Sequence, residues 1–146
     1  LTRLIGGKTD IVMMLNGALA GLVAITAEPL TPGPITAMVI GSIGAVIMYY
    51  GTKLLENFGL DDVVGAIPVH MFAGIFGTLV VPITNIDTSF GTQFIGVISV
   101  CIFSFVLSWI TFSTLKSTVG LRISRAAEKQ GTDKAEVGVI AYSIRD

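Results

Sequence analysis

Charge is what this chain has least of. Asp, Glu, Lys and Arg make up 13% of its 146 residues, whereas soluble domains carry about 25%. That is too little charge to cover the surface of a soluble domain of this size, but a protein that lies within a membrane does not need such a surface. The mean hydropathy of +0.82 also points to a membrane protein.

Cysteine and histidine each occur once, and this scarcity excludes several kinds of site. Cys101 cannot form a disulfide within the chain, and His70 has no second His, Cys or carboxylate at ligand spacing, so we expect no metal centre. No Ser–His–Asp arrangement falls within the apolar segments, so we expect no enzymatic activity and no cofactor. A net charge of −1 without a Lys/Arg cluster argues against a nucleic-acid partner.

Long apolar runs, in contrast, are abundant. Four such segments cover residues 11–27, 34–55, 63–81 and 90–115. None has a charged residue in its interior, and a spanning helix needs about 20 apolar residues, a length that the first segment only approaches. We therefore predict an all-α membrane bundle over residues 1–118 that crosses the lipid four times, followed by a polar tail over residues 119–146.

The basic residues predict the orientation of this bundle. With four alternating spans, all nine Lys and Arg residues fall on one side of the membrane, in the start of the chain, around Lys53 and in the tail from Lys116 to Arg145. That side is cytoplasmic by the positive-inside bias. The chain begins with Leu1 and shows no signal sequence, so we interpret it as a piece of a longer polypeptide.

Small residues recur along the segments at spacings that let helices approach closely. Gly17 and Gly21 lie four residues apart in the first segment, as do Gly41 and Ala45 in the second. Helices in lipid associate through such small residues, so we predict a tight bundle. Asn16 is expected to face protein, because lipid cannot satisfy its polar atoms.

The stretch "DDVVGAIPVHMFAGIFGTL", residues 61–79, contains the single histidine. Asp61 and Asp62 stand where a helix N-cap belongs. Pro68 falls inside the predicted helix and has no N–H to donate to the carbonyl of Val64, so a kink is expected at this proline.

At α-helical spacing, His70 shares a face with small residues only. These are Ala66, Ala73, Gly74 and Gly77. We therefore expect His70 to face neighbouring helices, with bulky Phe72 pointing elsewhere, as an uncharged imidazole with one hydrogen-bond donor and one acceptor. Two interpretations stay open from the pattern: a residue of a transport pathway, or a structural histidine bonded to a backbone carbonyl.

Three motifs together resemble the ammonium transporter family of the Amt/Mep/Rh type. They are "NGALAGLVAITA" (16–27), the histidine stretch (61–79) and "VGLRIS" (119–124). The resemblance implies an eleven-helix fold of two inverted repeats, assembled as a homotrimer in the cell (inner or plasma) membrane. This chain would supply the last four helices and a cytoplasmic tail.

The resemblance also implies a function in nitrogen metabolism. In this family ammonium gives up its proton and crosses a channel-like pore as ammonia, past two histidines, of which His70 matches the second. Ala66 matches a pore-lining apolar position, and Asp62 matches the acid at the start of the helix. A PII-type regulatory protein is the partner implied at the tail, although "RAAE" (125–128) replaces the family's acidic run. The alternative function is an ammonium-sensing membrane domain of a signalling protein.

Overall fold

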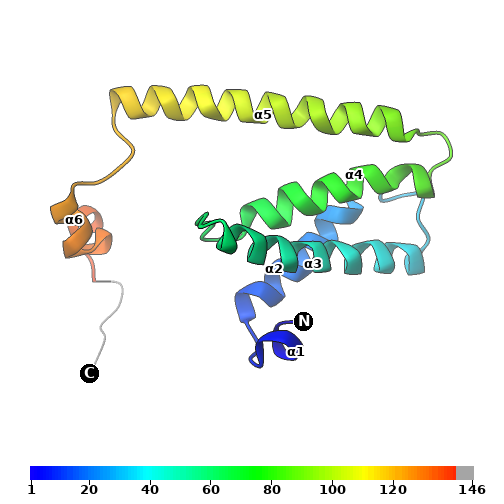
Figure 1. Ribbon diagram of the computed structural model, residues 1–146, viewed down its shortest axis with the longest axis horizontal. Coiled ribbons are helices and arrows are strands. Elements are labelled where there is room, and N and C mark those ends of the chain that lie inside the picture. The colour runs from blue at the N-terminus through cyan, green and yellow to red at the C-terminus, as the bar shows by residue number, and fades with distance from the viewer. Residues whose placement is uncertain (141–146) are drawn as a thin grey trace. The chain divides into compact units, whose positions relative to one another are not determined.

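The computed structural model describes residues 1–140, and Arg145 therefore lies outside the described residues. The described part is all-helical, with no strand in it. Along the chain the α-helices are α1 (Thr2–Gly6), α2 (Ile11–Ile25), α3 (Pro34–Asn57), α4 (Ala73–Thr84), α5 (Phe90–Thr118) and α6 (Arg125–Gln130) (Figure 1). Two π-helical segments complete the list, η1 (Ile67–Phe72) directly before α4 and η2 (Asp133–Val137) after α6.

Three helical stretches are long and apolar enough to cross a membrane. They are Pro34–Asn57, Ile67–Thr84 and Phe90–Thr118. The first predicted span, residues 11–27, corresponds to α2, whose 15 residues fall short of the roughly 17 that a crossing helix needs. α2 stops at Ile25 because the chain then enters a loop with two prolines, and the hydroxyl of Thr26 donates to the carbonyl of Val23 at 2.6 Å.

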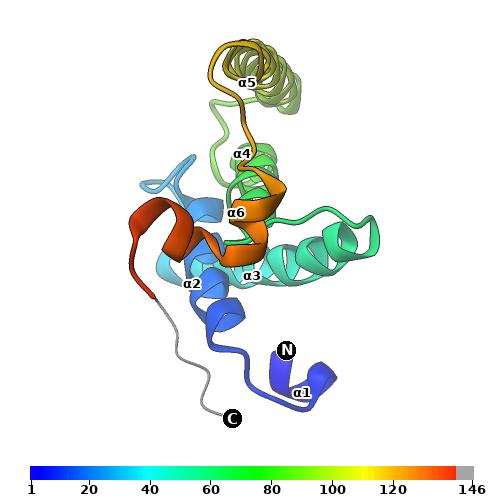
Figure 2. The ribbon, with the colours of Figure 1, turned by 90° about the vertical axis from the view of Figure 1, so that its left-hand side faces the viewer.

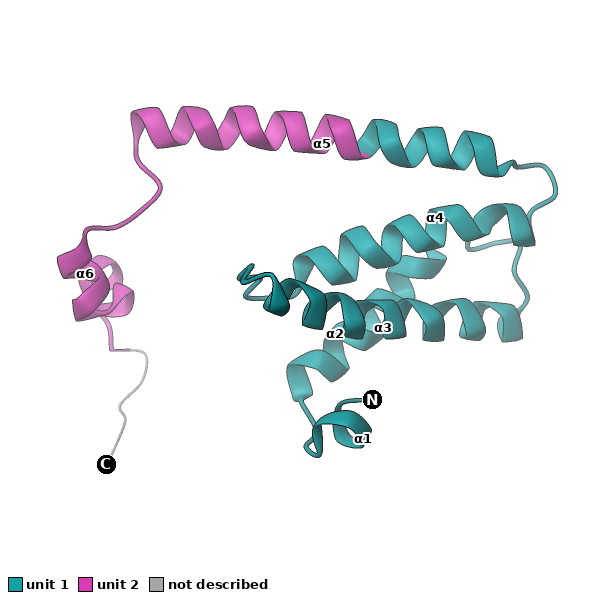
Figure 3. Cartoon of the chain, viewed as in Figure 1, with its two compact units in different colours: residues 1–100 teal, residues 101–146 magenta. Residues whose placement is uncertain are grey.

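The chain divides into two compact units, residues 1–100 and residues 101–146 (Figure 3). The first unit holds α1 to α4 and the beginning of α5, and its core consists of Ala20, Met48, Val69 and Ala73. The second unit holds the rest of α5 and the tail segments α6 and η2. None of the residues of α5 is buried within the described chain, and an apolar helix of this length suits a lipid environment.

Within the first unit, α2 crosses α3 with backbone nearly touching backbone (Figures 1 and 2). A methyl group added to Gly21 of α2 would lie 3.1 Å from the carbonyl oxygen of Gly41 in α3. One added to Gly44 would lie 2.6 Å from the Cβ of Ala24. The prediction that small residues bring these helices close together is confirmed for α2 and α3.

A side-chain hydrogen bond joins the loops that follow α2 and α4. The amide of Asn85, the residue directly after α4, donates to a carboxylate oxygen of Glu28 at 3.0 Å. α2 and α4 are therefore linked at this end by side chains, in addition to the packing of Gly77 against the backbone of Ala24.

Candidate functional site

Asp62 organises the turn that leads into the histidine-bearing segment. Its two carboxylate oxygens accept the backbone N–H groups of Ala66 at 2.9 Å and Ile67 at 2.8 Å. Two donors that a helix start leaves unpaired are thereby satisfied by one charged side chain. The neighbouring Asp61 makes no hydrogen bond within residues 1–140, so the two acids differ in their contacts.

Pro68 occupies a different place from the one predicted. The helical stretch with the histidine begins at Ile67 rather than at residue 63, so Pro68 lies in its first turn. At that position the missing N–H costs no helical hydrogen bond, and no helix precedes the proline for it to kink. Val64 lies in the turn before this stretch, and its carbonyl accepts no backbone N–H in the described residues; the side-chain amide of Asn16 donates to it at 2.9 Å.

His70 lies in the π-helical turns of η1, and its side chain is exposed in the described chain. The buried stripe of this stretch consists of Val69, Ala73, Gly77 and Val81. The prediction that His70 shares its face with Ala73 and Gly77 is therefore wrong, and Ala66 is exposed as well. The reason is that i→i+5 hydrogen bonding widens the turn and shifts the faces away from those of a 3.6-residue wheel.

The ring of Phe72 helps to hold η1 in place. It packs over Gly51 of α3, where an added methyl group would lie 2.9 Å from the Cε2 atom of the ring and 3.2 Å from Pro68. Phe72 was predicted to point away from the neighbouring helices, and the widened turn again explains why it does not. The bare backbone at Gly51 receives the ring and was not singled out by sequence spacing.

A hollow of about 340 Å³ with a mixed polar and apolar lining lies beside the start of η1. It is lined by Thr52, Leu55, Glu56, Leu60, Asp61, Asp62, Val63, Gly65 and Pro68. Of its three acids, Glu56 is paired with Lys53 at 2.8 Å and Asp62 is occupied by the backbone. Nowhere in residues 1–140 does a group of three or more His, Cys, Asp and Glu side chains lie close enough to hold a metal ion.

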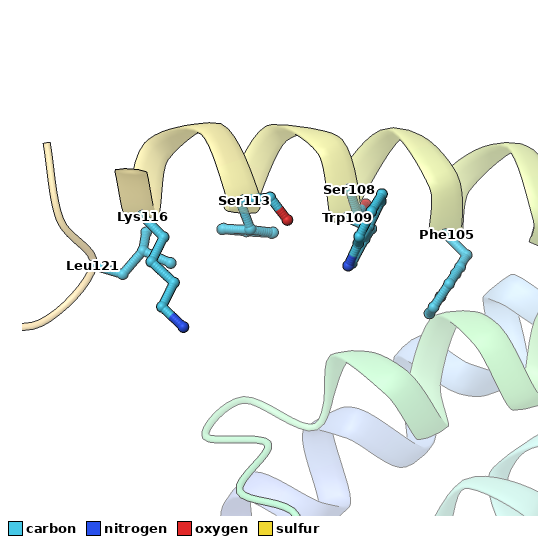
Figure 4. Close-up of a pocket in the computed structure, with 7 residues that line it drawn as sticks. Phe105, Ser108, Trp109, Ser113, Lys116 and Leu121 are labelled. Atoms are coloured by element: carbon cyan, nitrogen blue, oxygen red, sulfur yellow. The ribbon is translucent and has the colours of Figure 1, made fainter. Parts of the chain in front are cut away.

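A second hollow, of about 310 Å³, runs along the last turns of α5 (Figure 4). Phe105, Ser108, Trp109, Phe112, Ser113, Lys116 and Leu121 line it. Trp109 and Lys116 are side chains typical of the boundary between a membrane and water, because each combines an apolar body with a polar tip. This groove therefore fits the end of a membrane span better than a reaction site.

η1 carries one exposed imidazole, that of His70, while Val69 and Phe72 on its other side pack against the neighbouring helices. The sequence had indicated His70, Ala66, Asp62 and Pro68, which are near neighbours in the chain; Pro68 and His70 lie in η1, and Asp62 and Ala66 lie just before it. The sequence did not indicate that Asn16 of α2, 48 positions before Val64, donates a hydrogen bond to the turn before η1. Two features of the sequence could have indicated this contact. Asn16 is a polar residue in an apolar helix, and Pro68 has no N–H to offer the carbonyl of Val64.

Comparison with known proteins agrees with the resemblance. The sequence profile of the Ammonium Transporter Family matches residues 1–142. The ammonium transporter Amt2 of Archaeoglobus fulgidus is 39% identical over 97% of this chain, and the ammonium transporter Amt2 of Methanocaldococcus jannaschii is 35% identical over 95% of it. An ammonium transporter of Corynebacterium glutamicum is 29% identical over 97% of the chain. The chain covers 35% of the length of each of these relatives.

Proposed function

The chain belongs to the ammonium transporter family, and on that premise we propose that it forms part of a path for ammonium or ammonia through a membrane, with His70 and Ala66 lining that path. The observation that carries the proposal is the exposure of His70 on a segment whose opposite side is buried. An imidazole in that position is available to a guest or to a further helix of the same pore.

The chemistry of the guest supports this role. Moving an ammonium ion into an apolar pore carries a large desolvation cost, which neutral ammonia avoids. A neutral imidazole offers one donor and one acceptor, and ammonia can use either. The side chain of Ala66 is a methyl group with no polar atom, so it offers water no hydrogen bond along the path.

His70→Ala in the full-length protein is the direct test of this proposal. We expect the substitution to change the initial rate of ammonium uptake into liposomes, or the selectivity between ammonium and potassium, by about tenfold, the effect of losing one hydrogen bond to a poorly solvated group. Thr78→Val is the matched control, because it removes a polar group whose bond is to its own helix, at the Gly74 carbonyl. Unaltered rate and selectivity in His70→Ala would overturn the pore role.

The same proposal includes an orientation. The tail after α5 faces the cytoplasm of a cell whose inner or plasma membrane holds the protein, and the loop between α4 and α5 faces the other side. Support comes from the one-sided distribution of Lys and Arg and from Lys116 in the last turn of α5. A homotrimeric assembly and a PII-type partner at the tail belong to this proposal on the basis of the family alone.

Cysteine labelling checks the orientation. Cys101 is the single cysteine of these 146 residues. In a full-length background in which Cys101 and every cysteine outside these residues are replaced by serine, a cysteine placed at Glu128 or at Asp87 reports on one side only. We expect a membrane-impermeant maleimide to label Glu128→Cys from the cytoplasmic side and Asp87→Cys from the opposite side, because one span, α5, separates them. Labelling of both from the same side would contradict the arrangement.

A further inference from the structure

Asn16 of α2 reaches the segment that leads into η1. Its side-chain amide donates to the carbonyl oxygen of Val64 at 2.9 Å, across 48 positions of the sequence. Within residues 1–140 this is the side-chain hydrogen bond that joins α2 to the stretch before His70. The Asn16 side chain is half-buried and Val64 is exposed, so the bond lies at the edge of the packed helices of the described chain.

Val64 lies in the turn before η1, and its carbonyl needs a partner from outside that turn. In an α-helix its donor would be the N–H of residue 68, and Pro68 has none. Free backbone groups near a membrane are satisfied by neighbouring helices when lipid cannot do so. Asn16 supplies that donor, while Asp62 accepts the two free N–H groups of the same turn.

The turn and the amide also fit each other sterically. Gly65 adopts a φ of +72°, a left-handed conformation that side chains other than glycine seldom take. A methyl group at Gly65 would lie 2.6 Å from the Nδ2 atom of Asn16. The amide therefore occupies the space that a side chain at residue 65 would fill, so the turn has one well-defined shape when Asn16 is in place.

The turn is connected to the histidine by a short hydrogen-bonded path. The N–H of Gly65 donates to the carbonyl of Asp62 at 3.1 Å, and the N–H of Val69 donates to the carbonyl of Gly65 at 3.1 Å. Val69 is buried in the core of the first unit and directly precedes His70. A shift of the turn is therefore passed on to the backbone that carries the imidazole.

We propose that Asn16 is a positioning residue for His70: by holding the Val64 carbonyl it fixes the start of η1 and with it the direction of the imidazole. This inference rests on the proposed function of His70 as a pathway residue. Asn16 itself touches neither substrate nor reacting atoms in this proposal.

The test is Asn16→Asp in the full-length protein reconstituted in liposomes, with initial uptake rates measured separately for ammonium and methylammonium. The substitution keeps the size of the side chain but removes the donor and sets a carboxylate against a carbonyl. We expect the ratio of the two rates to change about fivefold, the effect of misplacing one hydrogen-bonding group. A purely structural loss lowers the amount of folded protein and scales both rates equally, so it leaves this ratio unchanged.

Asn85→Asp is the matched control. It makes the same chemical change and also removes a donor from a side-chain bond between two segments, here to Glu28, but it lies at the C-terminal end of α4, away from η1. We expect it to leave the ratio of the two rates unchanged. Asn16→Ala serves as a second variant if Asn16→Asp folds poorly, since it leaves room for a water molecule at the Val64 carbonyl, and it is expected to change the ratio in the same direction.

A double substitution separates this inference from the proposed function. If Asn16 acts through His70, Asn16→Asp has no further effect on the ratio in a His70→Ala background. Two results would overturn the positioning role and leave the pore role of His70 intact. One is an equal effect of Asn16→Asp on the ratio in both backgrounds. The other is an unchanged ratio in both Asn16 variants when His70→Ala does change it. An unchanged ratio, rate and selectivity in His70→Ala overturns both.

Discussion

Gly77→Ala is expected to lower the free energy of unfolding by about 3 kcal/mol, at the upper end of the range for overpacking. The added methyl group would lie 2.8 Å from the carbonyl carbon of Ala24 and closer still to its oxygen. The carbonyl of Ala24 belongs to the backbone of α2, so no side chain can rotate away to make room for the methyl group. The helices α2 and α4 would have to separate, which exposes the core around Ala20 and Ala73.

Gly74→Ala is the matched control in the same helix. A methyl group at Gly74 would meet only the Cγ1 atom of Val23 at 3.6 Å, an ordinary van der Waals contact. Both substitutions raise helix propensity by a similar amount, so any difference between them measures the clash. Thermal unfolding of the purified protein in detergent compares the two, and equal midpoints would contradict the close approach of α2 and α4.

The second large effect is expected from Asp62→Ala, which removes both acceptors from the start of η1. Loss of the two bonds to Ala66 and Ile67 should destabilise the protein by about 2 kcal/mol, the cost of losing a good helix cap. Because the capped turn precedes His70, the initial rate of ammonium uptake should fall as well. Thermal unfolding and liposome uptake measure the two effects on the same preparation.

Asp61→Ala provides the comparison at the adjacent position. It removes the same charge from the same side of the bundle, but Asp61 makes no hydrogen bond within the part of the chain that the structure describes. We expect a change in stability within about 0.5 kcal/mol, as for most surface substitutions. If the two alanine variants were equally destabilised, bulk charge rather than capping would be the cause.

Much of the helical architecture was predictable because membrane-spanning helices are recognisable as long apolar runs without charged residues. The ranges 34–55 and 90–115 lie within α3 and α5, and the glycine spacing predicted the close contact of α2 with α3. Helix starts were less predictable where a turn intervenes. "DDVVGA" reads as a cap followed by a helix, yet the left-handed Gly65 inserts a turn and delays the helix to Ile67.

The candidate site was predictable in its residues but not in its geometry. His70 and Asp62 stand out by their chemistry alone in an apolar stretch. The direction of His70 depends on the hydrogen-bonding pattern of η1, and no residue type in "IPVHMF" distinguishes an i→i+5 turn from an α-helical one. Contacts between distant positions, such as Asn16 with Val64 and Gly51 with Phe72, arise from packing and leave no periodic trace in the sequence.

The π-helical turns of η1 mean that the length of the chain between Asp62 and the buried stripe is itself under constraint. An i→i+5 turn holds one residue more than an α-helical turn of the same position, so η1 behaves as if a residue had been inserted at the level of His70. Deleting one residue there would let a regular α-helix form without rotating the capped end against Ala73 and Gly77, because the wide turn already absorbs the extra residue. The imidazole, however, would turn to another face of the helix. The angular phase of the imidazole against the bundle is therefore set by counting residues as much as by their identity.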